Sequence, residues 1–234
     1  ATRNLELEAL NFFRSKQVDG LLIHAGELTD DDILKISTET PATVVLNHYI
    51  PEIAENCIGL DEELGGYLAT KHLLDNGHTK IGCITGPMNQ NDCRERLLGY
   101  RNALAEYGIQ YDSNLIVEGH FDLENNHLAP NRLLDRDIQL TAIFCQNDHI
   151  ALGVYDALQE RNLCVGDDIS VVGFDNSIYA AQVYPKLTSV NFPTKEMGAE
   201  ATRKVLSLIK KTDYSMPCKL TPELIIRDSV KRIN

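Results

Sequence analysis

Short apolar runs that end on polar or aromatic residues, each followed by a helical pattern, recur five times along this chain. The runs end at Asp61, Thr85-Gly86-Pro87, Phe121-Asp122, Asn147-Asp148 and Asp175-Asn176. Alternating strands and helices of this kind build a parallel sheet covered by helices. Ligands of such sheets bind beyond the carboxyl ends of the strands, so the sequence predicts a cleft lined by these polar groups.

Composition limits what that cleft can serve. With 234 residues, 43% of them hydrophobic, the chain can form one large domain or two lobes with cores of their own. A formal net charge of -12 argues against direct binding of nucleic acid phosphates or an acidic membrane. The sequence contains no apolar stretch of roughly 20 residues and no signal-peptide pattern, so we expect a cytoplasmic protein.

The six cysteines favour free thiols over a disulfide framework or a zinc site. They are Cys57, Cys83, Cys93, Cys145, Cys164 and Cys218, and no two of them form a Cys-x-x-Cys pair. Several lie in apolar strand patterns, where cysteine packs as a small hydrophobic residue.

Periodicity predicts alternating elements along the whole chain. Helices are expected at 5–16, 31–38, 62–75, 92–107, 125–134, 149–162 and 195–210. Strands are expected at 18–25, 43–48, 56–61, 80–85, 115–121, 142–145, 169–175, 187–192 and 223–227. A doubly wound sheet normally begins with a strand, whereas the first element here is a helix. We therefore expect the first strand of the first lobe to be absent from this chain.

Signatures of catalysis and cofactor binding are absent from the sequence. It has no phosphate-binding Gly-x-x-x-x-Gly-Lys loop, no Gly-x-Gly-x-x-Gly fingerprint, no Gly-x-Ser-x-Gly elbow and no His-Glu-x-x-His pair. We expect neither a cofactor nor a metal site, and no enzyme. A hydrolase using Asp61 and Asp175 as paired carboxylates is a distant alternative.

The polar groups at the strand ends suit a neutral, polyhydroxylated ligand. Asp61 and Asp175 can accept hydrogen bonds from hydroxyls, Asn147 can donate and accept, and Arg96 offers a fork of donors. Phe121 supplies a flat apolar face. Sugars present hydroxyl edges and a weakly apolar ring face, so this set predicts a sugar site.

Each of these residues also has an ordinary structural role. Asp61, Asp148 and Asp175 can cap the helices that follow them, and capping is the favoured role for Asp148. Arg96 lies within a helical pattern, where a solvated surface charge is more common. Phe121 is more often a core residue. The prediction of a ligand site therefore depends on their joint placement at strand ends.

Several longer segments resemble the effector-binding core of the lactose and galactose repressor family. They are Asp61 with Gly65-Gly66, Gly77-His78-Thr79-Lys80-Ile81-Gly82 with Gly86-Pro87, Arg96-Leu97-Leu98-Gly99-Tyr100, Asn147-Asp148, Asp168-Ile169-Ser170-Val171-Val172-Gly173-Phe174-Asp175, and Leu224-Ile225-Ile226-Arg227-Asp228-Ser229. The resemblance covers nearly the whole chain in order. Galactose- and ribose-type repressors are the closest in appearance.

The resemblance implies an α/β, two-lobed fold of the periplasmic-binding-protein type, each lobe a parallel sheet flanked by helices, with three crossovers and the effector between the lobes. The first lobe would hold 1–60 plus 192–214, and the second 61–191 plus 215–234. Members of the family also carry an upstream helix-turn-helix head that binds operator DNA, and that head is absent from this sequence. The resemblance further implies a homodimer without membrane contact.

The resemblance assigns ligand contacts to seven positions, which are Asp61, Gln90, Asp92, Arg96, Phe121, Asn147 and Asp175. It implies that Arg96 and Asp175 bond effector hydroxyls, that Asn147 adds a polar contact and that Phe121 stacks on the ring. Residues at the positions of Gln90 and Asp92 differ with effector identity in such proteins.

The resemblance implies that this chain is the ligand-sensing and dimerising part of a transcriptional regulator, in the first instance a repressor. The affinity of such a regulator for its operator changes when it binds a small effector, here most simply a neutral sugar. Two alternatives remain open. One is a sugar receptor that delivers its ligand to a transporter. The other is the same class of regulator with a purine or nucleoside effector.

Overall fold

The computed structural model describes residues 2–15, 18–24, 26–121 and 127–233, and it divides into two units. Unit 1 comprises Ala1–Leu60 and Pro193–Thr221, and unit 2 comprises Asp61–Phe192 and Pro222–Asn234. The chain therefore passes between the units three times. Parts of the predicted elements at residues 16, 25, 122, 125 and 126 lie outside the described residues.

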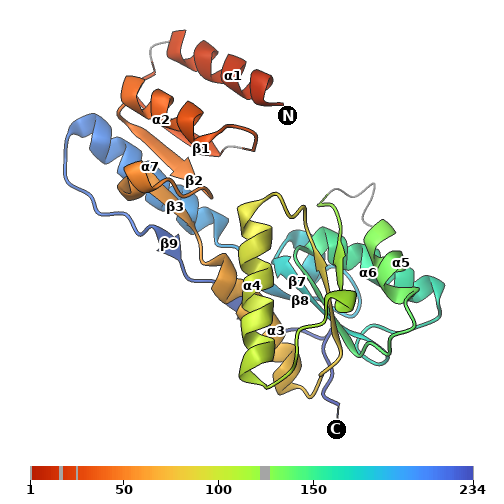
Figure 1. Ribbon diagram of the computed structural model, residues 1–234. Coiled ribbons are helices and arrows are strands. Elements are labelled where there is room, and N and C mark those ends of the chain that lie inside the picture. Colours follow the sequence, from red (N-terminus) through yellow and green to blue (C-terminus); the bar gives the residue numbers. More distant parts are fainter. Residues whose placement is uncertain (1, 16–17, 25, 122–126, 234) are drawn as a thin grey trace. The chain divides into compact units, whose positions relative to one another are not determined.

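Unit 1 is a four-stranded sheet with helices on both faces (Figure 1). Its elements are α1 (Arg3–Ser15), β1 (Leu21–His24), α2 (Asp30–Glu39), β2 (Thr43–Leu46), η1 (Pro51–Asn56), β3 (Cys57–Leu60), α7 (Thr194–Lys210) and β9 (Lys219–Leu220). The strand order is β1-β2-β3-β9, and every pair is parallel. Leu21 and Ile23 alternate along β1 and pack with Ile33, Ile36 and other apolar residues of α2 and the neighbouring strands.

Unit 2 is a six-stranded sheet with the order β10-β8-β7-β6-β4-β5. Its helices and strands are α3 (Glu62–Asp75), β4 (Ile81–Thr85), α4 (Asn91–Glu106), β5 (Ile116–Glu118), α5 (Leu128–Leu134), β6 (Ala142–Cys145), α6 (Asp148–Glu160), β7 (Ser170–Asp175), β8 (Thr188–Asn191) and β10 (Glu223–Ile225). Two short 3-10 helices, η2 (Ser113–Leu115) and η3 (Ile178–Ala181), complete it. All pairs are parallel except β10 with β8, which is antiparallel at the edge.

The predicted fold class is confirmed, with parallel-strand sheets flanked by helices. The assignment of 215–221 to the second lobe is wrong, because β9 pairs in parallel with β3 and groups with unit 1. A strand of two residues carries no periodicity that could have revealed it. All six cysteines are unpaired, and four of them are buried. None of the helices in the described part of the chain is long and apolar enough to cross a membrane.

Helices α3 and α4 cross at two glycines, where their backbones touch. A Cβ atom on Gly66 would overlap the carbonyl oxygen of Arg96, and one on Gly99 would overlap the carbonyl oxygen of Glu63. Backbone atoms cannot move aside as a side chain can. The two glycines therefore fix how closely α3 approaches α4, and with it the placement of the side chains at their N-terminal ends.

Gly99→Ala is expected to destabilise the protein by about 2–3 kcal/mol, the usual cost of overpacking a rigid contact. Gly198→Ala is the matched control, because a Cβ on this glycine of α7 meets no atom within 4 Å. That change should instead stabilise the helix by about 0.5–1 kcal/mol. Urea unfolding of both variants measures the difference, and equal midpoints would show that the α3–α4 crossing tolerates a methyl group.

Candidate functional site

The polar groups that the sequence places after the strands gather at the carboxyl ends of the unit 2 strands. We refer to this side of the sheet as its carboxyl edge. Strands β4, β6 and β7 are neighbours in parallel register, so their carboxyl ends lie side by side. Gly86, Gln146-Asn147 and Asp175 follow or end these strands, and the N-terminal turns of α3, α4 and α6 begin near the same edge.

Arg96 is buried at this edge and is not a solvated surface charge. Only 4% of the residue is exposed. Its Nε donates to a carboxylate oxygen of Glu62 at 2.7 Å, and one terminal nitrogen donates to the carbonyl oxygen of Gln146 at 2.5 Å. The guanidinium carbon lies 3.7 Å from the centre of the Phe174 ring. Three sides of the guanidinium are therefore held in place.

The remaining edge of the Arg96 guanidinium carries unused hydrogen-bond donors. Of its five N–H groups, two are used by these bonds, which leaves three without a hydrogen-bond acceptor among the residues that the structure describes. Asp92, on the first turn of α4, comes within 3.9 Å of the second terminal nitrogen. That distance allows an ion pair but exceeds a hydrogen bond.

Asp175 ends β7 with a backbone conformation that is costly for a residue with a side chain. Its φ is 98°, and that of the following Asn176 is 49°. Such strain persists where the surroundings enforce it, and it is frequent at ligand sites. None of the described donors forms a hydrogen bond with the Asp175 carboxylate, so the expected alternative of a helix cap is wrong for this residue.

The surroundings raise the pKa of Asp175 to about 7. Burial is the main cause, and the neighbouring Asp148, Glu62 and Asp92 carboxylates add to it, while the Arg96 charge acts in the opposite direction. A carboxylate held in this way lacks the hydrogen bonds that would stabilise its charge. Donors from a ligand would supply them.

A buried network holds the loop that follows Asp175. The Asp148 carboxylate accepts hydrogen bonds from the Ser177 amide at 2.6 Å and from the Ser189 hydroxyl at 2.7 Å. The Ser189 hydroxyl in turn accepts from the Asn176 amide at 3.0 Å, and Arg227 donates to the Asn176 side-chain oxygen at 2.6 Å. Residues from α6, β8 and the segment after β10 therefore enforce the strained conformation.

Two of the candidate side chains cap helices. Asn147 accepts a hydrogen bond from the Ile150 amide at 2.8 Å and so caps α6, whereas Asp148 does not, contrary to the role favoured for it from the sequence. Asp61 accepts from the Leu64 amide at 3.2 Å and caps α3. Capping uses one oxygen of each residue. The Asn147 amide nitrogen has no acceptor within the described part of the chain.

Phe121, Gln90 and Asp92 differ in their exposure. The half-buried Phe121 ring packs so closely against Gly86 that a Cβ atom on this glycine would overlap the ring. Gln90 is exposed and precedes α4 without capping it, and Asp92 is half-buried. The structure thus brings Arg96, Asp92 and Asp175 together, and it places Phe121 after β5 and Asn147 after β6, the two strands on either side of β4.

Sequence reasoning missed three residues that shape this edge: Glu62, Gln146 and Phe174. Gln146 is fully buried, its side-chain oxygen accepts from the Gly86 amide at 3.1 Å, and its nitrogen donates to the Cys93 carbonyl at 3.0 Å. It thereby ties the end of β4 to the first turn of α4. All three directly adjoin a predicted site residue in the sequence, which was the available signal.

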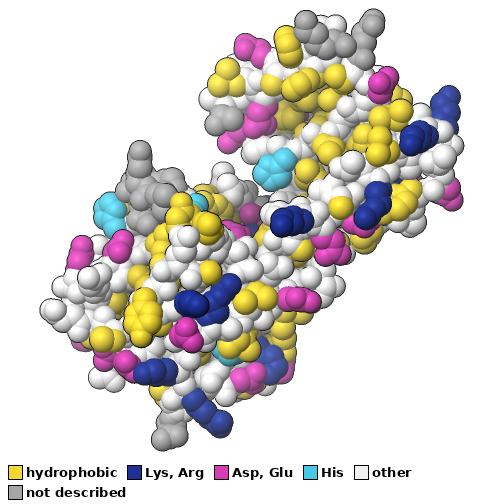
Figure 2. Space-filling view, turned by 180° about the vertical axis from the view of Figure 1, so that it is seen from behind, with side chains coloured by type: hydrophobic (Ala, Val, Ile, Leu, Met, Phe, Trp, Pro, Cys, Tyr) yellow, Lys and Arg dark blue, Asp and Glu magenta, His cyan; other side chains and the backbone are white. Residues whose placement is uncertain are grey.

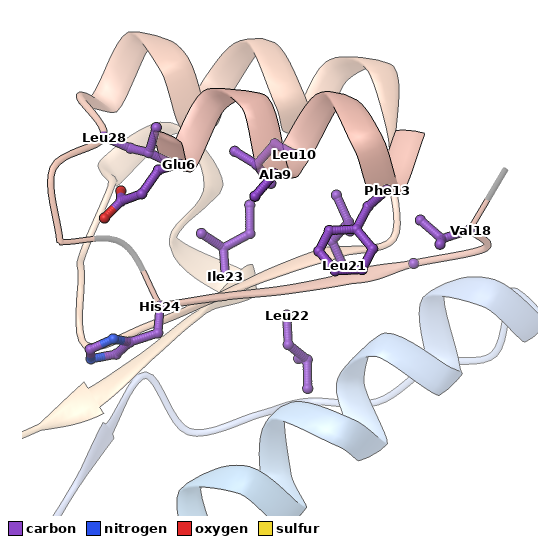
Figure 3. A pocket seen from close by; sticks show the side chains of 11 residues that line it. Glu6, Ala9, Leu10, Phe13, Val18, Leu21, Leu22, Ile23, His24 and Leu28 are labelled. Carbon is purple, nitrogen blue, oxygen red and sulfur yellow. The ribbon is translucent and has the colours of Figure 1, made fainter. Parts of the chain in front are cut away.

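A pocket lies in unit 1 between α1 and β1 and has a volume of about 450 Å³ (Figure 3). Apolar side chains such as Leu10, Phe13 and Ile23 line most of it, with Glu6 at one end. It offers few hydrogen-bonding groups, so it does not suit a polyhydroxylated ligand. The described residues contain no group of three or more His, Cys, Asp or Glu side chains that could hold a metal ion.

Known proteins agree with this architecture. Residues 70–230 match the family described as periplasmic binding protein-like domain. The HTH-type transcriptional repressor PurR of Vibrio vulnificus is 36% identical over 228 residues, which cover 96% of this chain and 68% of the relative. This chain belongs to the LacI family of transcriptional regulators.

Solved structures of the LacI family have the same fold. A sugar-binding LacI-family regulator from Escherichia coli, complexed with phosphate, has a TM-score of 0.91 and 29% identity, covering 100% of this chain and 84% of that one. A LacI-family regulator from Enterococcus faecium with bound ribose has a TM-score of 0.87 and 27% identity, covering 98% and 86%. The predicted resemblance is confirmed, and the chain carries the effector-binding domain of a LacI-family transcriptional repressor.

Proposed function

We propose that the edge of unit 2 binds a neutral, polyhydroxylated effector, most simply a sugar, and that binding changes the affinity of the repressor for its operator. One observation carries this proposal. The Asp175 carboxylate lacks a hydrogen-bond donor among the described residues, and it lies near three unused N–H groups of Arg96. Adjacent sugar hydroxyls can donate to the first group and accept from the second.

The charges favour a neutral ligand. Glu62, Asp92 and Asp175 surround the single Arg96 charge, so an anion gains little at this edge. The ribose bound to the Enterococcus faecium relative supports the same class of effector. A purine or nucleoside is the second candidate, since the relatives named PurR are 36% identical and the half-buried Phe121 ring could stack on a base.

The effector acts by its preference for one of two states of the repressor. A ligand shifts such an equilibrium only by the ratio of its affinities for the two states, and operator DNA must respond reciprocally. In this proposal Asp175 and Arg96 supply the affinity difference, and operator DNA is bound through the helix-turn-helix head of the family.

Calorimetric titration with pentoses, hexoses, disaccharides, their phosphates and purines tests the proposal. We expect one neutral sugar to bind with a Kd in the micromolar to millimolar range, and to be lost in Asp175→Ala. If only purines bind, the effector is the second candidate, a purine or nucleoside, and not a sugar. Binding of a sugar that survives the substitution would place the effector elsewhere.

We also propose that the repressor is a homodimer. Ile178 and Tyr184, in the segment between β7 and β8, are 68% and 93% exposed, the two highest values among the large apolar side chains that the structure describes. Aromatic residues of this kind are enriched in subunit interfaces.

Tyr184→Asp is expected to weaken the dimer at least tenfold in light scattering, whereas Tyr49→Asp, which alters an exposed tyrosine of unit 1, should leave it unchanged. Monomeric wild-type protein would refute the dimer.

A further inference from the structure

The charge around Arg96 is dominated by carboxylates. Glu62 is in direct contact, Asp92 lies 3.9 Å away, and Asp175 interacts electrostatically with the same guanidinium. When all four groups are ionised, three negative charges and one positive charge sum to -2. Lys and Arg side chains elsewhere on the molecule are interspersed with acidic and hydrophobic ones on the face in Figure 2.

Glu62 differs from the other two carboxylates because it accepts a hydrogen bond from Arg96. Only 7% of the residue is exposed, and it begins α3, whose approach to α4 is fixed by the contact of Gly66 with the Arg96 carbonyl. The carboxylate is held against the guanidinium by the hydrogen bond of 2.7 Å from Arg96 Nε. Its negative charge offsets the positive charge of the guanidinium from the Nε side. The three N–H groups without an acceptor therefore act as hydrogen-bond donors with little net positive charge.

We propose that Glu62 is a specificity-determining residue that makes this site reject phosphorylated and other anionic effectors, an inference that rests on the proposed binding of a neutral effector at the same edge. An arginine recognises phosphate tightly when its charge is unopposed and its N–H groups face the oxygens in pairs. Here a phosphate that binds to the free N–H groups of Arg96 is repelled by the negative charges of Glu62, Asp92 and Asp175. A neutral sugar uses the same donors without that repulsion.

Glu62→Gln isolates this effect. Glutamine retains an oxygen that can accept from the Arg96 Nε but carries no charge. Glu63→Gln is the matched control, because Glu63 is the next residue of α3, accepts a hydrogen bond from Asn102 at 2.8 Å and does not contact Arg96. The two variants have the same net charge, so long-range electrostatics cancels in the comparison.

Titration of both variants with inorganic phosphate at pH 8, where Asp175 is mostly ionised, measures the charge of the site without any sugar. We expect Glu62→Gln to bind phosphate roughly tenfold more tightly than the wild type, the size expected for removing one charge several ångströms from an anion in a partly buried site. Glu63→Gln should match the wild type. Ribose 5-phosphate should gain in the same way as phosphate.

Equal phosphate affinities for the two variants would overturn the inference, as would wild-type binding as tight as that of Glu62→Gln. If Glu62→Gln loses its cooperative unfolding transition, Asp92→Asn replaces it, because this change removes the carboxylate 3.9 Å from Arg96 at a half-buried position. No gain in phosphate affinity for Asp92→Asn would then count against the charge argument. If every neutral sugar failed to bind but the phosphate difference between Glu62→Gln and Glu63→Gln remained, the sugar effector would be refuted and the charge effect of Glu62 on anion binding would stand.

Discussion

Asp175→Asn is expected to weaken effector binding by 10- to 100-fold or more and, at the same time, to raise the melting temperature at pH 8. Hydrogen bonds to a charged group contribute about 1.5–3 kcal/mol each, and a sugar can donate two to this carboxylate. Ionised Asp175 also destabilises the empty protein, because its folded pKa of about 7 lies above the ordinary value of 3.8. An amide removes that cost.

The sign of the pH dependence follows from the two pKa values. Below about pH 4 the carboxyl is protonated in both the folded and the unfolded state, so its stabilising effect is fully present. As the pH rises, the unfolded state ionises first, and the effect is lost by the time the pH has passed through about 7. The stability difference between Asp175→Asn and the wild type should therefore grow from pH 5 to pH 8.

Thermal unfolding at pH 5 and pH 8 measures this difference, and calorimetry with the bound sugar measures the loss of affinity. Asp156→Asn is the control, because Asp156 is an exposed aspartate on α6 of the same unit. A melting temperature that falls at pH 8 in Asp175→Asn would show that the carboxylate stabilises the fold and is not a site strained for its ligand.

Arg96→Met is expected to cost about 3–5 kcal/mol in the free energy of unfolding, since it leaves the Glu62 carboxylate buried without its partner. The double variant Arg96→Met/Glu62→Gln should regain most of that stability, because no charge is then buried unpaired. Effector binding should be lost in both. The two effects separate the structural role of the ion pair from the role of the free guanidinium edge.

Urea unfolding of the wild type, the two single variants and the double variant gives the coupling energy. Arg101→Met is the control on the same helix, where Arg101 is exposed and lies over the Tyr111 ring at 4.2 Å, a contact worth about 0.5–1 kcal/mol. A cost below about 1 kcal/mol for Arg96→Met would mean that Glu62 finds solvent when its partner is removed.

Much of the fold could be predicted because its signals are local. Helix α3 has the predicted bounds Glu62–Asp75, since Asn76-Gly77 stops it, and β6 has the predicted bounds Ala142–Cys145. The gathering of polar strand ends at one edge also followed from parallel topology. The ligand contacts assigned to those residues stay predictions.

Other features depended on contacts between distant segments. A helical pattern shows Arg96 among charged neighbours, but it does not show that the first turn of another helix brings Glu62 against it, 34 positions earlier in the chain. Asn147 and Asp148 are adjacent and either can cap a helix, so the sequence could not fix which of them caps α6. In the structure the cap is Asn147. Two-residue β9 has too few side chains to carry a pattern.

The order in which the strands pair has a consequence for synthesis of the protein. Strand β9 completes the sheet of unit 1, β10 completes that of unit 2, and Arg227 reaches back to the loop that follows Asp175. A nascent chain on the ribosome therefore cannot finish either sheet until residues 219–227 have emerged from the exit tunnel. Until then the open sides of β3 and β8 remain unpaired strand edges that chaperones or aggregating chains can reach.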